Sequence, residues 1–135
     1  MIESAGGSST ADGGDGHDRL VGSNGDDTLS GGLGNDTLIG KEGSNTLRGC
    51  SNAEADASAC ESDGENHYLS GLGSDTIRGA GGLDVVFFPG TKASYSINEE
   101  CSTDECTVSL KDSSPSSTIY NAEILIFTDA RIDLD

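Results

Sequence analysis

Acidic and amide side chains recur in this chain every nine residues, with glycines at fixed positions between them. Asp18, Asp27 and Asp36 are followed at the same interval by Asn45. Carboxylate and amide oxygens, together with backbone carbonyls, are the ligands of hard divalent cations such as calcium, which takes six to eight oxygens. The spacing therefore predicts metal binding, provided that the fold brings oxygens from several copies together.

These side chains belong to a nine-residue unit that is written four times between Gly13 and Arg48 and three more times between Glu61 and Phe87. Position four of every unit is glycine, position six is Asp or Asn, and position eight is a large apolar residue. The position-six residues are Asp18, Asp27, Asp36, Asn45, Asn66, Asp75 and Asp84. The position-eight residues are Leu20, Leu29, Leu38, Leu47, Tyr68, Ile77 and Val86. Fixed positions at a constant period predict a repeat architecture.

The order of residue types within a unit predicts the element that each part forms. Glycines at positions one and four favour a tight turn over the first six positions. The last three positions, polar–apolar–polar, are long enough for a short strand whose middle side chain points inward. Two units would then complete one coil of a right-handed parallel solenoid, with the position-eight residues stacked in an apolar ladder and the position-six residues stacked two units apart.

Stacked carboxylates and turn carbonyls repel one another unless a cation lies among them, and calcium suits such an oxygen set. The unit resembles the RTX (repeats-in-toxin) nonapeptide, G-G-x-G-x-D-x-U-x with U a large apolar residue. The resemblance covers Gly13 to Phe87 and implies a β-roll that holds Ca²⁺ between successive turns. It implies that turn glycines contribute to the metal sites beside the position-six residues. These glycines are Gly14, Gly16, Gly25, Gly32, Gly34, Gly43, Gly64, Gly73 and Gly82.

Departures from the RTX pattern rank the expected sites. Asp18 facing Asp36 forms the best pair, and Asp27 facing Asn45 comes next. Asn66 facing Asp84 is expected to be intermediate, if the interruption between the two blocks of repeats counts as one unit. Asn at position six carries no charge, so these turns should bind calcium more weakly. Lys41 replaces glycine at position two and is expected to point outward.

Composition limits the class of protein. The chain has 135 residues, a formal net charge of −17, 4% aromatic residues and no Trp. Low hydrophobicity with high net charge favours disorder, so the repeats are expected to be largely unfolded without calcium. The acidity argues against binding to nucleic acid. No apolar run approaches the roughly 20 residues of a membrane span.

The cysteines form two locally spaced pairs. Cys50 and Cys60 bound the interruption of the repeats, residues 49–60, which we expect to be an enlarged turn; Cys101 and Cys106 flank an acidic loop. Two short-range disulfides, Cys50–Cys60 and Cys101–Cys106, are the preferred pairing among three, and they indicate an oxidising compartment. A zinc site that uses the cysteines with His67 is the rival hypothesis, but the spacings do not match usual zinc patterns.

Ordinary β-strand signals follow the repeats. Residues 1–12 are expected to form a leading cap or the cut edge of a longer chain, and residues 88–135 an antiparallel β cap that covers the end of the roll. Alternating apolar residues predict strands around Tyr95 and Val108, and Ala93 belongs to the same alternation. The segment TIYNAEILIF, residues 118–127, and the final RIDLD complete the cap. The cap also resembles the C-terminal segment of many RTX modules.

The sequence shows no recognisable catalytic group. His17 lies in a turn and His67 at a strand edge, and neither is paired with a nucleophile, so we expect a non-catalytic module. The predicted function is a calcium-binding, extracellular module that folds when it meets calcium, monomeric and part of a larger secreted protein. The alternative is a calcium-dependent module that binds an acidic polysaccharide or cell-surface glycan through outward residues such as Arg19, Arg48 and Arg78.

An ice-binding surface is disfavoured because alternate units should place the position-seven threonines on opposite faces, leaving too few on each. These threonines are Thr28, Thr37, Thr46 and Thr76.

Overall fold

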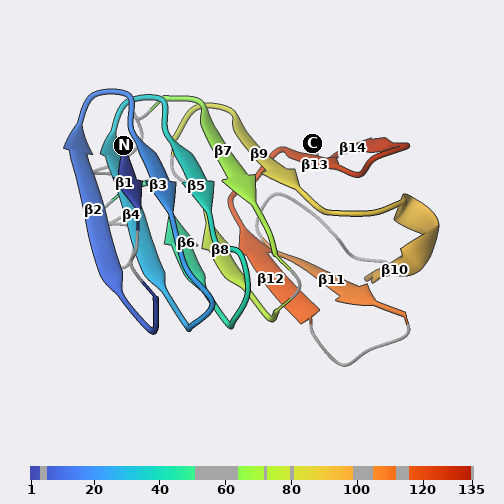
Figure 1. The fold of residues 1–135 in the computed structure, drawn as a ribbon. Coiled ribbons are helices and arrows are strands. Elements are labelled where there is room, and N and C mark those ends of the chain that lie inside the picture. Colours follow the sequence, from blue (N-terminus) through green and yellow to red (C-terminus); the bar gives the residue numbers. More distant parts are fainter. Residues whose placement is uncertain are drawn as a thin grey trace.

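The computed structural model describes residues 1–3, 6–50, 64–71, 73–79, 81–98, 105–111 and 116–134. Short strands follow one another along the described chain, interrupted by one 3₁₀ turn, η2 (Lys92–Ser94) (Figure 1). The strands of the N-terminal part are β1 (Ile2–Glu3), β2 (Thr10–Asp15), β3 (Arg19–Val21), β4 (Thr28–Leu33), β5 (Thr37–Ile39) and β6 (Thr46–Arg48). Those that follow are β7 (Asn66–Leu69), β8 (Thr76–Arg78), β9 (Asp84–Phe87), β10 (Tyr95–Ile97), β11 (Cys106–Leu110), β12 (Ser116–Tyr120), β13 (Ile124–Ile126) and β14 (Arg131–Asp133).

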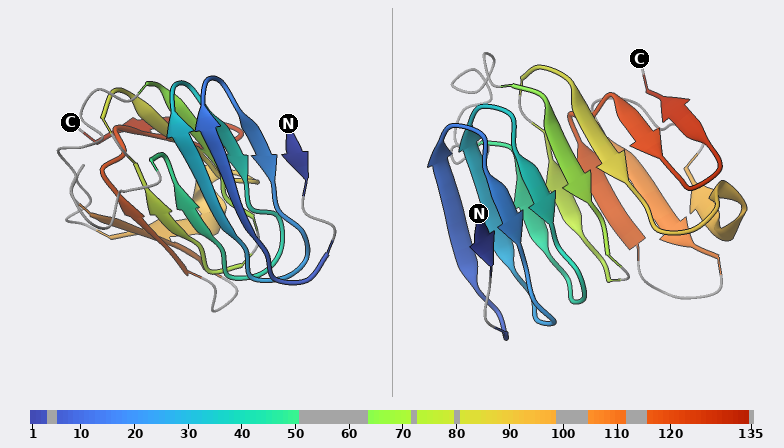
Figure 2. Two further views of the ribbon diagram at one scale, coloured as in Figure 1. Left: turned by 90° about the vertical axis from the view of Figure 1, so that its left-hand side faces the viewer. Right: turned by 45° about the horizontal axis from the view of Figure 1, so that its top comes forward.

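Successive strands of the repeats alternate between two sheets that face each other (Figure 2). One sheet has the order β1-β3-β5-β7-β9-β13-β14, and the other has the order β10-β11-β12-β8-β6-β4-β2. Neighbouring strands within the repeats run parallel. The fold is therefore all-β, and its repeats form the expected parallel β-roll.

The register shows that two nine-residue units make one coil. Leu20 pairs with Leu38 and Leu29 with Leu47, each 18 residues apart. Across the interruption the offset grows to 30 residues, since Leu38 pairs with Tyr68 and Leu47 with Ile77. The condition that the interruption counts as one repeat unit is therefore wrong. The unit that contains Tyr68 stacks on the unit that contains Leu38, so the alternation between the two sheets continues as if residues 49–60 were absent from the count.

The position-eight side chains fill the narrow space between the sheets. All seven of them, Leu20, Leu29, Leu38, Leu47, Tyr68, Ile77 and Val86, have an exposed fraction of 0%. Ile119 of β12 and Leu125 of β13 extend the same ladder toward the C-terminus, because they pair with Ile77 and Val86. Burying each side chain of this size contributes about 1.5–3 kcal/mol.

Replacing Leu38 by Ala is expected to lower the free energy of unfolding by about 2–5 kcal/mol, because the cavity lies between Leu20 and Tyr68 in a ladder that has few ways to collapse. Urea denaturation in saturating calcium measures the change. The control is Leu33→Ala, at a side chain that is 48% exposed, and it should cost less than about 0.5 kcal/mol. Equal losses in the two variants would contradict the assignment of Leu38 to the core.

The roll continues into the C-terminal segment before the antiparallel strands begin. β12 pairs parallel with β8, and β13 pairs parallel with β9. β10, β11 and β14 pair antiparallel, as expected for a cap. The cap is thus mixed rather than purely antiparallel, because two of its strands complete one more coil.

Within residues 118–127 the chain turns between β12 and β13, with Asn121 at a φ of 55°, and the two halves join opposite sheets. One local expectation for this segment was wrong. Ala93 lies in η2 and is exposed instead of continuing the alternation of β10.

An aromatic cluster closes the C-terminal end of the core. The ring of Phe88 stacks on that of Phe127, with centroids 5.3 Å apart, and Tyr95 packs against Phe127 at 5.2 Å. The Tyr95 hydroxyl donates a hydrogen bond to the Pro89 carbonyl, and burial raises the pKa of Tyr95.

The two described cysteines are not free thiols. Cys50 and Cys106 are buried and disulfide-bonded. They are therefore unavailable as zinc ligands, which removes the rival metal hypothesis for these two residues. Cys60 and Cys101 lie outside the described residues, so the expected pairings Cys50–Cys60 and Cys101–Cys106 stay predictions, as does the enlarged turn at residues 49–60.

Candidate metal centre

The position-six side chains form two rows, one along each edge of the roll. The row that we call the Asp18 row consists of Asp18, Asp36, Asn66, Asp84 and, in the C-terminal segment, Glu123. The row that we call the Asp27 row consists of Ser9, Asp27, Asn45, Asp75 and Ser117. Each row joins turns that lie two units apart.

Hydrogen bonds between side chain and backbone connect the members of each row. The Asp18 amide donates to Asp36 Oδ1 at 2.8 Å, and the Asp36 amide donates to Asn66 Oδ1 at 2.9 Å. In the other row the Asp27 amide donates to Asn45 Oδ1 at 2.9 Å, and the Asn45 amide donates to Asp75 Oδ1 at 3.0 Å. The Oδ1 atoms of Asp36, Asn66, Asn45 and Asp75 are therefore engaged by the neighbouring turn.

Glycine at position one leaves room for converging oxygens. A Cβ atom on Gly13 would lie 2.5 Å from the Gly31 carbonyl oxygen and 2.8 Å from Asp18 Oδ2. A Cβ atom on Gly31 would lie 2.3 Å from Asp36 Oδ2. Any side chain at these positions would fill the space in which carboxylate and carbonyl oxygens meet.

These oxygens fit a calcium ion. Asp18 Oδ2 is buried and accepts no hydrogen bond from the described residues. One oxygen each of Asp36 and Asp84 is likewise buried, and both residues make other interactions. A buried carboxylate oxygen without a donor is costly, and a hard cation offsets that cost. Within the described part of the chain no three His, Cys, Asp or Glu residues gather as a metal cluster, so backbone carbonyls would have to complete the ligand set.

The predicted turn glycines lie where two turns approach most closely. A Cβ atom on Gly34 would lie 2.0 Å from the Gly16 carbonyl oxygen, and one on Gly43 would lie 2.3 Å from that of Gly25. A Cβ atom on Gly73 would lie 1.7 Å from the Gly43 carbonyl oxygen, and one on Gly64 would lie 1.9 Å from Asn35 Oδ1. Gly14, Gly32 and Gly82 have positive φ angles, of 91°, 106° and 91°. Close stacking or a positive φ thus explains the choice of glycine at these positions, while the part that the glycine carbonyls take in binding calcium stays a prediction.

Asn at position six changes the chemistry of a turn. Because Asn45 Oδ1 accepts a hydrogen bond from the neighbouring backbone, its amide nitrogen faces the turn and donates to the Glu42 carbonyl at 3.2 Å. Asn66 is held in the same way, with its amide nitrogen 3.5 Å from the Gly64 carbonyl. The amide presents a donor where Asp presents an oxygen, which supports the expectation of weaker binding at these turns.

Asp27 differs from Asp18, because protein donors surround both of its oxygens. Ser9 donates from its backbone amide and its hydroxyl to Oδ1, and the Ser23 amide donates to Oδ2. The Ser23 hydroxyl lies 3.2 Å from Oδ2 and 2.6 Å from the Gly7 carbonyl. Burial by itself would raise the pKa of Asp27, but the hydrogen bonds from Ser9 and Ser23 outweigh it and hold the pKa below its ordinary value.

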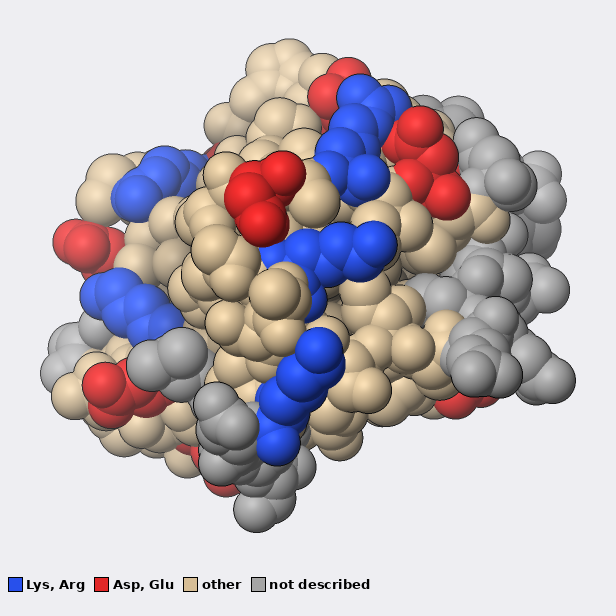
Figure 3. All heavy atoms as spheres, turned by 90° about the vertical axis from the view of Figure 1, so that its right-hand side faces the viewer, with Lys and Arg blue, Asp and Glu red and all other residues tan. Residues whose placement is uncertain are grey.

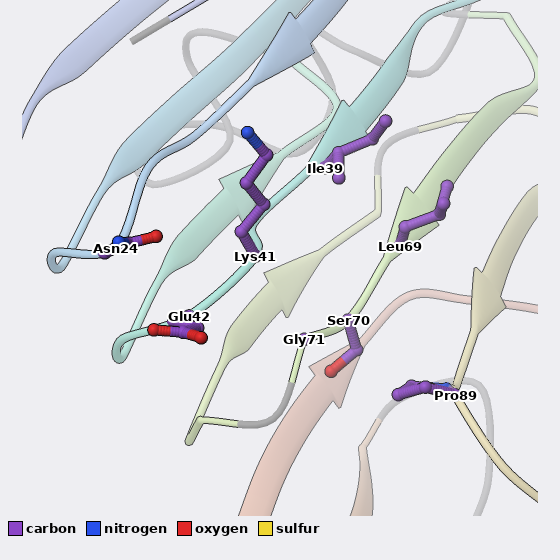
Figure 4. A pocket seen from close by; sticks show the side chains of 8 residues that line it. All are labelled: Asn24, Ile39, Lys41, Glu42, Leu69, Ser70, Gly71 and Pro89. Atoms are coloured by element: carbon purple, nitrogen blue, oxygen red, sulfur yellow. The ribbon is translucent and has the colours of Figure 1, made fainter. Parts of the chain in front are cut away.

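Lys41 is exposed, in line with its expected outward position. Its backbone has a φ of 66°, a left-handed conformation that glycine adopts more readily. The side chain lies beside an open groove of about 400 Å³ with apolar walls from Ile39, Leu69 and Pro89 (Figure 4).

Most of the remaining basic residues lie away from the turns. Lys92, Lys111 and Arg131 belong to the C-terminal segment, where Lys and Arg side chains are interspersed with Asp and Glu (Figure 3). Arg131 forms an ion pair with Asp133, at 2.8 Å, on that surface. Within the repeats Lys41 is the one basic residue at positions one to six. Basic side chains are thus poorly placed to neutralise the rows.

Ser9, Ser117 and Glu123 are members of the rows that we did not predict as site residues. The Asp84 amide donates to Glu123 Oε2 at 2.7 Å, and the Asp75 amide donates to Ser117 Oγ at 3.3 Å. One signal was present in the sequence: Ser117 and Ile119, and likewise Glu123 and Leu125, repeat the spacing of positions six and eight. The missing turn glycines concealed it.

Replacing Glu123 by Ala is expected to lower the free energy of unfolding in calcium by about 1–3 kcal/mol, because the amide of buried Asp84 loses its acceptor. Thermal unfolding followed by circular dichroism measures the loss. Glu105→Ala removes the same charge at an exposed position and serves as the control. If the two variants have the same melting temperature, Glu123 does not extend the row.

The two histidines have structural contacts. His17 Nδ1 accepts a hydrogen bond from the Asn35 amide at 3.0 Å, and His67 lies 3.3 Å from Glu65 and edge-on to the ring of Phe87. Neither contact is an arrangement for nucleophilic or acid–base chemistry. No helix in the described part of the chain has the length and apolar character to cross a membrane.

The family comparison agrees with this geometry. Residues 12–47 and 62–88 match the RTX calcium-binding nonapeptide repeat, in 4 copies. Among solved structures the chain is similar to the crystal structure of the extracellular lipase LipA from Serratia marcescens, with 16% sequence identity and a TM-score of 0.40. The similarity covers 86% of this chain and 15% of the lipase chain. No protein with a curated functional description matches the chain.

Proposed function

Because this chain belongs to the family of RTX calcium-binding nonapeptide repeats, we propose that it is a module of a secreted protein that folds on meeting extracellular calcium. The observation that carries the proposal is the pair of turns at Asp18 and Asp36. Their carboxylates are stacked two units apart, and one buried oxygen of Asp18 accepts no hydrogen bond from the described residues. When bound, calcium supplies the positive charge that lets these turns lie one over another.

The charge of the whole chain supports coupling between folding and metal binding. A net charge of −17 opposes compaction, and 20 glycines make the unfolded chain costly to order. The apolar ladder is one residue wide, so it offers limited compensation. Cations that bind only the folded state shift this balance by mass action.

One feature of the structure supports an extracellular setting. Cys50 and Cys106 are disulfide-bonded, which is typical of oxidising compartments. Extracellular calcium modules bind at about 10⁻⁴–10⁻³ M, well above calcium concentrations at which cytosolic sensors respond. A chain with such sites would remain unfolded until it met external calcium.

The test is a calcium titration of the whole chain, followed by circular dichroism and isothermal calorimetry. We expect binding and folding to share one midpoint, at about 10⁻⁴–10⁻³ M. A midpoint below about 10⁻⁶ M would contradict folding outside the cell. Binding to a chain that is already folded would contradict the coupling itself.

A second candidate function is binding to an acidic polysaccharide or glycan. Arg48 and Arg78 occupy adjacent strands in register, and the Arg78 guanidinium lies 4.6 Å from the centroid of the Tyr120 ring. Such a column of guanidinium groups suits carboxylate-bearing sugars. Binding of the calcium-loaded chain to alginate and pectin tests this function, with Arg78→Ala as the variant and Arg131→Ala as the control. If the unmodified chain binds neither polymer, the polysaccharide-binding function is excluded and only the proposed folding module remains.

A further inference from the structure

The two rows of turns differ in how their carboxylates are satisfied. In the Asp27 row, Asp27 Oδ1 accepts hydrogen bonds from the Ser9 amide at 2.9 Å and the Ser9 hydroxyl at 2.5 Å. Asp27 Oδ2 accepts a hydrogen bond from the Ser23 amide at 2.6 Å. The Ser23 hydroxyl lies 3.2 Å from the same oxygen but is only 2.6 Å from the Gly7 carbonyl, to which it donates. A carboxylate has about four acceptor sites, so protein donors already occupy most of the capacity of this buried group.

Asp75, the other carboxylate of the Asp27 row, is satisfied in a similar way. Its Oδ1 accepts a hydrogen bond from the Asn45 amide at 3.0 Å. Its Oδ2 accepts hydrogen bonds from the Ser70 hydroxyl at 2.9 Å and the Gly71 amide at 3.1 Å. The Ser70 hydroxyl also lies 3.3 Å from that of Ser117, so hydroxyl groups line this turn.

The turn between these two carboxylates presents donors as well. Asn45 directs its amide nitrogen at the Glu42 carbonyl, at 3.2 Å, so one carbonyl oxygen of that turn is already engaged. Lys41, at position two of the same unit, adds a positive charge to this edge of the roll. Every position-six residue of the Asp27 row thus has a protein partner on the side where a metal ion would lie, or carries no charge.

The turns at Asp18 and Asp36 lack the serine donors that lie beside Asp27. Positions one and two beside Asp18 and Asp36 are glycines, namely Gly13, Gly14, Gly31 and Gly32, which carry no hydroxyl. Asp18 Oδ2 is buried and accepts no hydrogen bond from the described residues. This row contains four carboxylates, Asp18, Asp36, Asp84 and Glu123, whereas the Asp27 row contains two, Asp27 and Asp75.

We propose that calcium binds along the Asp18 row only. In the Asp27 row, hydrogen bonds from serine hydroxyls and backbone amides hold the stacked turns together without metal. This inference rests on the proposed calcium-dependent function and refines it. The expected second-best site, Asp27 facing Asn45, is then not a calcium site. The position-six residues at that edge then serve to connect successive turns through hydrogen bonds.

The test counts calcium ions bound to the whole chain, by flow dialysis at saturating calcium, in matched variants. Asp36→Asn keeps an acceptor for the Asp18 amide but removes a charge, and we expect it to bind at least one ion fewer than the unmodified chain. Asp27→Asn and Asp75→Asn make the same change in the other row, and we expect the number of ions to stay unchanged. Loss of an ion in either of the latter variants would overturn the inference.

Crystals of the unmodified chain grown with terbium provide a second measurement that does not depend on the folding of variants. We expect anomalous scattering peaks beside Asp18 and Asp36 and none beside Asp27 and Asp75. Peaks along both rows would overturn the one-sided arrangement while leaving calcium-dependent folding intact. A chain that binds no calcium at all would instead overturn the proposed function and this inference with it.

Discussion

Removal of calcium with EGTA is expected to abolish most of the β-structure of this chain, leaving a spectrum dominated by unfolded polypeptide. Carboxylates of the Asp18 row would then face one another without a cation, in a chain whose net charge is already −17. The single-residue apolar ladder buries too little surface to offset this repulsion and the entropy of ordering the glycine-rich turns. Far-UV circular dichroism of the chelated chain measures the loss.

Returning calcium should restore the original spectrum, whereas magnesium at the same concentration should not. Magnesium demands near-ideal octahedral geometry and loses its water ligands reluctantly, and the turns offer backbone carbonyls in a fixed arrangement. A chelated sample that keeps its full β-sheet signal would contradict the dependence of the fold on metal.

Replacement of Asp36 should produce the second large effect, a rise of at least about tenfold in the calcium concentration needed for half-maximal folding, equivalent to about 1.4 kcal/mol. Asp36 is 2% exposed and stands between Asp18 and Asn66, so its loss leaves one charged side chain in the best pair of turns. Asp36→Asn isolates the charge, since it keeps the acceptor for the Asp18 amide. Asp36→Ala removes the acceptor too and should shift the midpoint further.

Calcium titrations followed by circular dichroism compare these variants with Asp133→Ala. That control removes the same charge from an exposed ion pair with Arg131, which contributes little to stability. If Asp133→Ala raises the calcium requirement as much as Asp36→Asn does, general repulsion rather than a specific site would explain the effect.

Periodicity alone predicted the core and the main rows correctly, because both follow from side-chain type at a fixed interval. Leu20, Leu29 and Leu38 are buried at the expected positions, and Asp18 faces Asp36. The leading segment also follows the nine-residue frame, since Ala11 pairs with Leu29. These features could be predicted because they depend only on the spacing of residue types along the sequence.

Features that depend on packing across units were harder to predict. Ser23 departs from the RTX pattern, but only the fold shows that its amide donates to Asp27 Oδ2 and its hydroxyl to the Gly7 carbonyl. Periodicity does not reveal the turn at Asn121 that separates β12 from β13. Glu123 was missed as a member of the Asp18 row because its place there depends on that turn.

The count of outward threonines was also wrong. The position-seven threonines do alternate between sheets, but Thr10 and Thr118 join the column of one sheet. That column is Thr10, Thr28, Thr46, Thr76 and Thr118. The neighbouring column holds mixed side chains instead of a second set of threonines, namely Asp12, Ser30, Arg48, Arg78 and Tyr120. A flat threonine array of the kind expected on an ice-binding face is therefore absent from this described sheet.

Paired residues are 18 apart before the interruption and 30 apart across it, yet the strands keep the same register within their sheet. Each new coil recognises the one before it through local contacts between turns, and not through the length of polypeptide that connects them. A foreign peptide inserted between Arg48 and Gly64 should therefore be carried as cargo at the rim, with Tyr68 still seated on Leu38. With folding coupled to calcium as proposed, a loop grafted at this position should be presented only by the calcium-bound chain.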